Sequence, residues 1–210
     1  MRIAVLGTGN VGSTLGRRWA KNGHEIIFGA RDPESGKVRS LLSSIGGSAR
    51  ATSVKEAVAA SDVVVLTIPW DATQDVIREA GSLDGKIVID CTNPLAEGLS
   101  GLSVGLTTSA GEKVAEWARG ARVVKAFNTT GAKNMADPQY GSQRVTMFIC
   151  GDDAEARKAV AELAAQLGFE VCETGPLYHA RYLEPMAMLW IDMAVKQGFG
   201  TDFAFKIIKR

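Results

Sequence analysis

The chain has 210 residues, of which 46% are hydrophobic, and its 24 basic and 23 acidic residues leave a formal net charge of +1. This length allows one well-packed core with at most a small appendage. The balanced charge argues against a nucleic-acid-binding surface. No apolar run approaches the ~20 residues that span a bilayer, so no membrane partner is expected.

The N-terminal residues Met1–Leu6 begin like a signal peptide, but the glycine-rich residues Gly7–Asn10 end the apolar run too early. We therefore expect a cytoplasmic protein that starts with a buried strand. Cys91, Cys150 and Cys172 are widely spaced and form neither a CxxC pair nor a Cys/His cluster. They are typical of small buried hydrophobic residues, and no metal site is predicted.

Short β-branched runs alternate with longer helix-like segments. The predicted strands are Arg2–Leu6, Glu25–Phe28, Ser48–Ala51, Val63–Ile68, Lys86–Asp90, Arg122–Ala126, Arg144–Cys150 and Phe169–Cys172. The predicted helices are Val11–Asn22, Pro33–Ile45, Val54–Ala60, Asp71–Ala80, Gly111–Ala118, Asp153–Leu167 and Leu183–Gln197. This alternation indicates a doubly wound, mostly parallel sheet with helices on both faces, the Rossmann-type α/β fold.

Two segments lack periodicity. Asn93–Ala110, rich in Gly, Ser and Thr, is expected to be a long loop beyond the fifth strand, and such loops are often functional. Thr129–Gln143 is similarly irregular and suggests a boundary. We expect a nucleotide-binding domain over residues 1–128. Residues 129–210 would form a smaller α/β extension that completes an acceptor cleft.

The strongest local motif is Gly7-Thr8-Gly9-Asn10-Val11-Gly12, directly between the first predicted strand and helix. Gly7 allows a tight turn, Gly9 lacks the Cβ that would block a pyrophosphate, and Gly12 lets the helix pack close to the sheet. Free amides at the helix N-terminus would face the phosphates. Because the motif has its required strand and helix, dinucleotide binding is favoured over a structural glycine turn.

The end of the second strand indicates which dinucleotide is bound. An Asp or Glu there typically binds the ribose of NAD, whereas this strand is followed by Ala30 and Arg31. A guanidinium suits a 2′-phosphate, and Lys37 adds a second positive charge. Asp32 leaves an alternative open, in which it pairs with Arg31 in a solvated turn. The sequence favours NADP(H).

Three further strand ends carry distinctive residues, and such ends meet at one edge of a doubly wound sheet. Thr67 and Asn128 are candidates to bind the ribose or the carboxamide, and Ile68 and Pro69 to form an apolar wall beside the nicotinamide. The remaining cofactor candidates at these ends are Asn93, Pro94 and Ala126. Pro and Asn are also common turn residues, so a purely structural role stays open for each. Trp70 is a candidate ligand platform or a packing residue.

The motifs in this order resemble the NADPH-dependent coenzyme F420 reductase family along essentially the whole chain. The matching pieces are Gly7–Gly12, Gly23-His24-Glu25-Ile26, Gly29-Ala30-Arg31, Leu66–Trp70, Cys150-Gly151-Asp152-Asp153 and Gly175-Pro176-Leu177 with Arg181 and Glu184. The chain is also similar to the cytosolic oxidoreductase domain of six-transmembrane metalloreductases, especially in Val124–Asn128. Ala30 departs from the family, in which a Ser or Thr often precedes the arginine.

The resemblance implies NADP(H) as cofactor and a flavin (FAD or FMN) or deazaflavin (F420) as small-molecule acceptor. It implies that Thr8, Gly9, Asn10, Val11 and Arg31 hold the phosphates, and that Ile68 and Pro69 lie near the nicotinamide. It places the acceptor ring against the turn with Pro176, Leu177, His179 and Arg181. The ring would then lie between this turn and Thr67–Trp70. For His179 a solvated loop position is favoured over a contact with the acceptor, and for Arg181 a pair with Glu184 one turn later is an equal alternative.

Direct hydride transfer between two such rings needs no catalytic residue, because the cofactors carry the chemistry. This agrees with a sequence that lacks an obvious acid–base pair, since His24 lies far from the expected cleft. The final helix has a wide apolar face, which suits either core packing or the seam of a homodimer.

Two other functions stay open. One is an NADP(H)-dependent reductase of a small imine or carbonyl, because Lys125 and Asn128 echo the Lys-xxx-Asn pair of β-hydroxyacid dehydrogenases. Here, however, the lysine ends a strand, and too few residues follow to build their helical domain. The other is a non-catalytic NADP(H) sensor, which would need the phosphate loop and Arg31 but no acceptor cleft.

Overall fold

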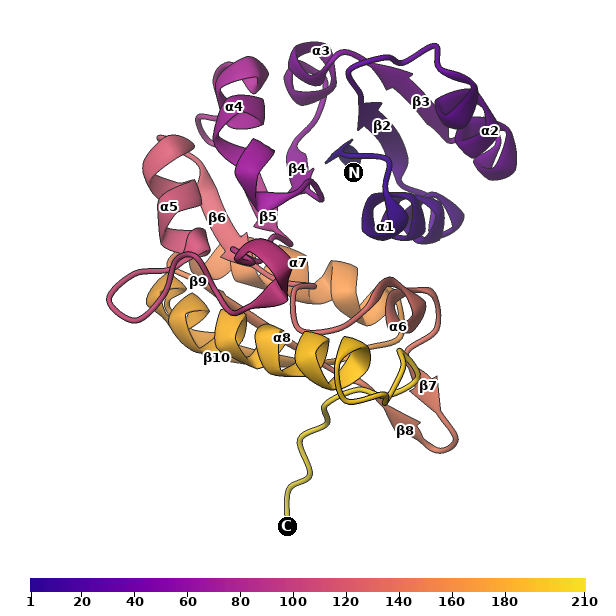
Figure 1. Cartoon of the computed structure of the whole chain (residues 1–210). Coiled ribbons are helices and arrows are strands. Elements are labelled where there is room, and N and C mark those ends of the chain that lie inside the picture. The colour runs from indigo at the N-terminus through magenta and orange to yellow at the C-terminus, as the bar shows by residue number, and fades with distance from the viewer.

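The computed structural model describes residues 1–210 and contains one eight-stranded sheet in the order β10-β9-β6-β5-β4-β1-β2-β3. The strands of this sheet are β1 (Arg2–Leu6), β2 (Glu25–Gly29), β3 (Ala49–Thr52), β4 (Val63–Leu66), β5 (Ile87–Asp90), β6 (Arg122–Lys125), β9 (Thr146–Gly151) and β10 (Glu170–Gly175). The helices are α1 (Asn10–Lys21), α2 (Gly36–Ile45), α3 (Val54–Ala59), α4 (Trp70–Ala80), α5 (Ala110–Trp117), α6 (Ala132–Ala136), α7 (Ala154–Gln166) and α8 (Ala180–Val195). Helices cover both faces of the sheet (Figure 1), which confirms the predicted fold class.

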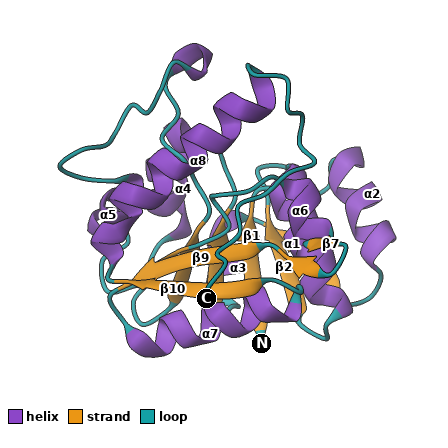
Figure 2. Cartoon of the chain, turned by 90° about the horizontal axis from the view of Figure 1, so that it is seen from below, coloured by secondary structure: helices purple, strands orange, loops and turns teal.

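Alternation of side chains along the strands explains the two helical layers. On β9, Met147 and Ile149 join a cluster with residues of α1 and α7, whereas Phe148 and Cys150 join Ala180 and Leu183 of α8. Figure 2 shows α7 and α8 on opposite sides of β9 and β10. Strand β4 at the centre of the sheet is therefore apolar and buried at every position, as expected for a doubly covered sheet.

One strand departs from the parallel arrangement. Strand β9 runs antiparallel to β6, with Val124 opposite Gly151 and Lys125 opposite Cys150, while β10 is parallel to β9. Gly175, the last residue of β10, pairs with Cys150, which lies opposite Lys125, the last residue of β6. This register decides where the following segment, including the short 3-10 helix η2 (Leu177–His179), begins.

The two irregular segments contain short elements that the sequence did not predict. Thr129–Gln143 includes α6 and the first strand of a small hairpin, β7 (Gln139–Tyr140) with β8 (Gln143–Arg144), and the long loop includes η1 (Glu97–Leu99). Helix α8 begins at Ala180, three residues before the predicted start, and contains Pro185. The elements α6, β7, β8 and η1 are too short for their periodicity to stand out in sequence.

Residues on both sides of the expected boundary after residue 128 pack into one hydrophobic core. The largest hydrophobic cluster includes Ile3 and Trp19 from the first part and Met147 and Phe169 from the second. The indole Nε1 of Trp19 also donates to the carbonyl oxygen of Leu163 at 3.2 Å. The division into two parts stays a prediction. None of the helices combines the length and apolar character needed to cross a bilayer.

Candidate functional site: a dinucleotide cleft at the strand ends

The glycine loop between β1 and α1 has the geometry of a phosphate cradle. A Cβ on Gly12 would lie 2.1 Å from the carbonyl oxygen of Gly7, so close packing requires glycine there. A Cβ on Gly9, by contrast, would meet no protein atom within 4 Å. Helix α1 has no side-chain cap and no acidic residue in its first turn, so its amides and positive dipole end suit an anion.

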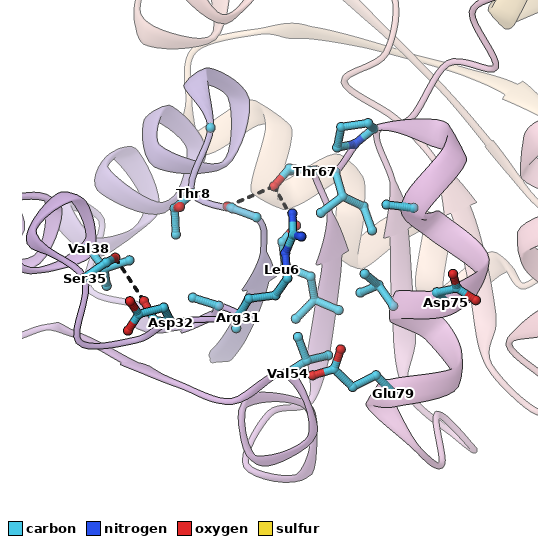
Figure 3. Close-up of a pocket in the computed structure, with 18 of the residues that line it drawn as sticks. Leu6, Thr8, Arg31, Asp32, Ser35, Val38, Val54, Thr67, Asp75 and Glu79 are labelled. Atoms are coloured by element: carbon cyan, nitrogen blue, oxygen red, sulfur yellow. Dashed lines mark hydrogen bonds between the residues drawn. The ribbon is translucent and has the colours of Figure 1, made fainter.

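A cavity of about 570 Å³ lies on the β2 side of this loop (Figure 3). Its lining includes Gly7, Thr8 and Gly9 of the loop, Ala30, Arg31 and Lys37 beyond β2, and Thr67, Ile68 and Pro69 beyond β4. These are nine of the predicted cofactor-binding residues. The structure thus brings together three segments that are far apart in sequence, at the position where an adenosine phosphate half would lie.

Arg31 is exposed at this cavity and forms no hydrogen bond or ion pair within the chain. Asp32, which offered an alternative partner, instead accepts a hydrogen bond from the amide of Glu34 at 3.1 Å. Figure 3 shows Ser35 against Asp32, and its hydroxyl donates to the carbonyl oxygen of Asp32 at 3.0 Å. The turn therefore leaves the guanidinium of Arg31 available for a ligand.

A second cavity of about 270 Å³ continues on the other side of Thr67–Pro69, toward β5. It is lined by Val11, Thr67, Ile68, Pro69, Trp70, Asp71, Cys91, Thr92, Asn93 and Leu95. The two cavities share three residues and flank the phosphate loop. Together they have the layout of a dinucleotide cleft whose second half can receive a ring.

Two predicted polar ligands are engaged by the protein itself. The hydroxyl of Thr67 contacts the carbonyl oxygens of Leu6 at 2.9 Å and Gly7 at 3.2 Å, and so supports the glycine turn. Asn128 donates to the side-chain oxygen of Asn93 at 3.1 Å, and Asn93 donates back to the carbonyl oxygen of Asn128 at 3.0 Å. This reciprocal pair joins the turns after β5 and β6 and orients Asn93 at the second cavity.

Five other predicted cofactor-binding residues line neither cavity. Gly12, Pro94 and Ala126 are buried behind the site, and Asn128 is 5% exposed. Phe127, beside Asn128, has a left-handed backbone with φ of 61°, an unusual conformation for an aromatic residue. Asn10 is exposed at the start of α1 and also lines neither cavity. These residues shape the loop and the turns around the cleft.

A buried ionic cluster lies behind the second cavity. Lys125 is fully buried, and its Nζ lies 2.9 Å from Asp90 Oδ2, 2.8 Å from Glu184 Oε1 and 2.6 Å from the carbonyl oxygen of Thr92. Burial alone would lower the pKa of Lys125, but the carboxylates of Asp90 and Glu184 outweigh it and raise that pKa. Lys125 is therefore held as an ammonium ion. The sequence did not predict this cluster, since only the sheet register brings Asp90 opposite Lys125.

The predicted acceptor segment does not meet Thr67–Trp70. Neither of the two cavities is lined by Pro176–Arg181, and α5 packs against α4 on one side and against η2 and α8 on the other. Trp70 lines the second cavity and stacks on Trp117 of α5 with ring centroids 5.2 Å apart. The position of the acceptor ring between the two segments stays a prediction. In the sheet, β9, β6 and β5 lie between β10 and β4, so the two segments follow strands that are well separated.

The individual residues of that segment also have partners. Leu177 is 4% exposed and packs in the core, so its side chain cannot face an acceptor. Arg181 pairs with Glu112, not with Glu184, through hydrogen bonds of 2.8 Å and 2.6 Å. His179 lies among Tyr178 and Tyr182, with ring centroids 4.5 Å and 5.5 Å away. Pro176 is exposed and caps η2.

Comparison with known proteins agrees with this geometry. The family model described as "NADP oxidoreductase coenzyme F420-dependent" matches residues 2–94. The chain is 34% identical over 212 residues to the F420-dependent NADP reductase of Methanothermobacter thermautotrophicus, covering 93% of this chain and 90% of that protein. It is 29% identical to the rat metalloreductase STEAP3, of which it spans 36%.

Among solved structures, a putative F420-dependent NADP-reductase from an Arthrobacter species superposes with a TM-score of 0.91 at 32% identity, covering all of both chains. An imine reductase from Aspergillus terreus shares the fold at a TM-score of 0.69 and 20% identity, with 63% of its length covered.

The fold and the cleft define an NADP-dependent oxidoreductase of the Rossmann class. Within this class, the chain belongs to the family of coenzyme F420-dependent NADP oxidoreductases.

Proposed function

We propose that this enzyme transfers hydride directly between the nicotinamide of NADP(H) and the deazaflavin ring of a coenzyme F420-like acceptor. The observation that carries the proposal is the second cavity. Its wall beside the phosphate loop consists of the apolar residues Val11, Ile68 and Pro69. The lysine nearest to it is locked between two carboxylates. Such a site suits a reaction that needs stacking and exclusion of water.

In this proposal, the chain binds NADPH along the two cavities. NADPH, when bound, supplies the hydride from nicotinamide C4. The open space at Gly9 leaves room for the pyrophosphate against the α1 amides, and Arg31 with Lys37 would hold the 2′-phosphate. Ile68 and Pro69 would support one face of the nicotinamide, so that the acceptor ring approaches the other face near Trp70.

F420 is favoured over a flavin because the relatives that match along nearly their whole length are named F420-dependent NADP reductases. The rat metalloreductase matches only over 36% of its length. FMN and FAD, which the sequence resemblance also implies, are alternatives to be assayed.

The experiment is a steady-state assay of NADPH oxidation, followed by loss of reduced-nicotinamide absorbance, with F420, FMN or FAD as acceptor. We expect the highest kcat/KM with F420, and much weaker turnover with NADH. NADPH binding without oxidation by any of the three acceptors would contradict the proposal and favour a sensor. A ring-closed imine and a small 2-oxo acid serve as substrates for the rival reductase.

The rival imine or carbonyl reductase would need a proton donor beside the substrate carbon. Lys125, the residue that suggests this activity, has its three N–H donors directed to Asp90, Glu184 and Thr92. Its buried position leaves no donor for a substrate. Turnover of the imine at a rate above that with F420 would nevertheless overturn our assignment.

We also propose a homodimer formed through α8. Leu189 and Val195 are more than half exposed on this helix, and Tyr182 and Phe199 are likewise exposed on it or just beyond it. Aromatic and large apolar side chains are enriched in protein interfaces. Light scattering at micromolar concentration should give twice the chain mass of 22.3 kDa, and a monomer mass would contradict this proposal.

A further inference from the structure

Lys125 connects the core to the turn that borders the second cavity. Its ammonium has three N–H donors, and three oxygen acceptors surround it at 2.6 to 2.9 Å. Two of these acceptors are carboxylates on β5 and α8. The third is the carbonyl oxygen of Thr92, which belongs to the turn itself. All three N–H donors of Lys125 therefore have an acceptor, and one of these acceptors is a backbone oxygen.

Asp90 holds the same turn from its other side. Its Oδ1 accepts hydrogen bonds from the amide of Thr92 at 2.9 Å and from the Thr92 hydroxyl at 2.7 Å. Every polar group of Thr92 is therefore bound to the Asp90–Lys125 pair. Such charge-assisted bonds in a buried setting are stronger and more restrictive than neutral ones.

Thr92, the residue held by this pair, belongs to the wall of the second cavity. Thr92 and Asn93 both line the second cavity, and Asn93 is oriented further by its reciprocal bonds with Asn128. Glu184 completes the cluster: its two carboxylate oxygens accept the amides of Ala110 at 2.9 Å and Gly111 at 3.0 Å. The N-terminus of α5 thereby offsets the extra negative charge of the cluster.

We propose that Lys125 is a positioning residue that acts through Thr92 and Asn93 to set the width of the nicotinamide pocket. The inference rests on the proposed function insofar as that function places the nicotinamide in the second cavity. The first cavity, where the adenosine phosphate half would bind, shares no residue with this cluster. A change at Lys125 should therefore affect one half of the dinucleotide only.

The test compares the equilibrium dissociation constants of NADPH and of adenosine 2′,5′-bisphosphate, which lacks the nicotinamide half. The ratio of the second constant to the first measures what the nicotinamide half adds to binding. In Lys125→Met we expect this ratio to fall roughly tenfold, with the bisphosphate constant changed by less than about twofold. General loss of folding would weaken both ligands together and could not produce this pattern.

A second variant and a control keep the test decisive. Asp90→Asn, which loses the ion pair but keeps an acceptor for Thr92, should lower the ratio in the same direction and less strongly. It decides the matter if Lys125→Met does not fold. Lys86→Met is the matched control, because Lys86 donates to the carbonyl oxygen of Ser61 at 2.6 Å just before the opposite end of β5. Its ratio should equal that of the wild type.

A ratio within about twofold of the wild type in both cluster variants would overturn the inference, as would a wild-type ratio near one. No acceptor is used in this experiment. Wild-type protein that binds NADPH but reduces no acceptor would refute the proposed hydride transfer and leave this measurement interpretable.

Discussion

At the scale of single residues, the two glycines at the helix end of the phosphate loop are glycine for different reasons. Gly12 is glycine because a Cβ would collide with the Gly7 carbonyl and with Thr67 Oγ1 at 2.5 Å. Gly9 has an ordinary extended backbone, with φ of −77°, and open space where a Cβ would project. Packing thus requires one glycine, whereas ligand access requires the other.

This difference predicts opposite outcomes for two alanine substitutions. Gly9→Ala should melt at nearly the wild-type temperature but bind NADPH roughly tenfold or more weakly, because its methyl occupies pyrophosphate space. Gly12→Ala should lose about 1–3 kcal/mol of folding free energy through overpacking. Thermal melts and calorimetric titrations check both, and wild-type affinity in Gly9→Ala would contradict the cradle.

Arg31 should determine the choice between the two dinucleotides. Removing a charge-assisted bond to the 2′-phosphate costs about 1.5–3 kcal/mol, so Arg31→Ala should weaken NADPH binding roughly ten- to a hundredfold. NADH, which lacks that phosphate, should bind almost as before. Arg39→Ala is a suitable control, since Arg39 is an exposed arginine on α2 outside the cavity. Equal losses for both nucleotides would contradict this role.

At the scale of elements, α5 and α8 are joined by the pair between Glu112 and Arg181. The hydrogen bonds from Arg181 are the main reason that the pKa of Glu112 lies below its usual value. Because the folded pKa is lowered, the pair stabilises the fold at pH values above the unfolded pKa of about 4.3. This contribution is lost as pH falls through the lower, folded value.

Replacing the arginine should therefore have a small, pH-dependent effect. Both side chains are partly exposed to solvent, so Arg181→Met should lower the free energy of unfolding only slightly at pH 7. The difference from wild type should shrink toward zero below roughly pH 4, as the carboxylate becomes protonated in both states. Urea unfolding at two pH values measures this. A larger difference in acid than at neutral pH would show that another contact is responsible.

At the scale of the whole molecule, the chain is a nucleotide-binding half extended by β9, β10 and their helices into one sheet. The C-terminal segment adds to this continuity, since the amide of Thr146 on β9 donates to the carbonyl oxygen of Phe205 at 3.2 Å. Trp190 and Asn134 both donate to the carbonyl oxygen of Phe203. The second half stabilises the first through contacts such as those of Trp19 with Leu163 and of Lys125 with Glu184.

A fragment of residues 1–128 should consequently fail to fold cooperatively. It would expose Trp19 and Phe127, which pack in the shared core, and would leave Lys125 without Glu184. Near-ultraviolet circular dichroism during heating should show no sharp transition. A cooperative melt together with NADPH binding would instead establish residues 1–128 as an independent domain.

The sequence alone determined the class of fold, most element positions and the dinucleotide motif, because these depend on local periodicity and on residues next to one another in the chain. Gly7–Gly12 lies between its strand and helix in sequence, so its role needed no tertiary information. Arg31 was equally visible, since it lies two residues after the second strand.

Tertiary structure alone decided which distant residues share a site. Pro176–Arg181 and Trp70 follow strands that are separated by β9, β6 and β5 in the sheet, and no local pattern records the order of strands. The Lys125 cluster joins β5, β6 and α8, whose residues are up to 94 positions apart between Asp90 and Glu184. Such pairings depend on sheet register and helix packing, which are properties of the folded chain as a whole.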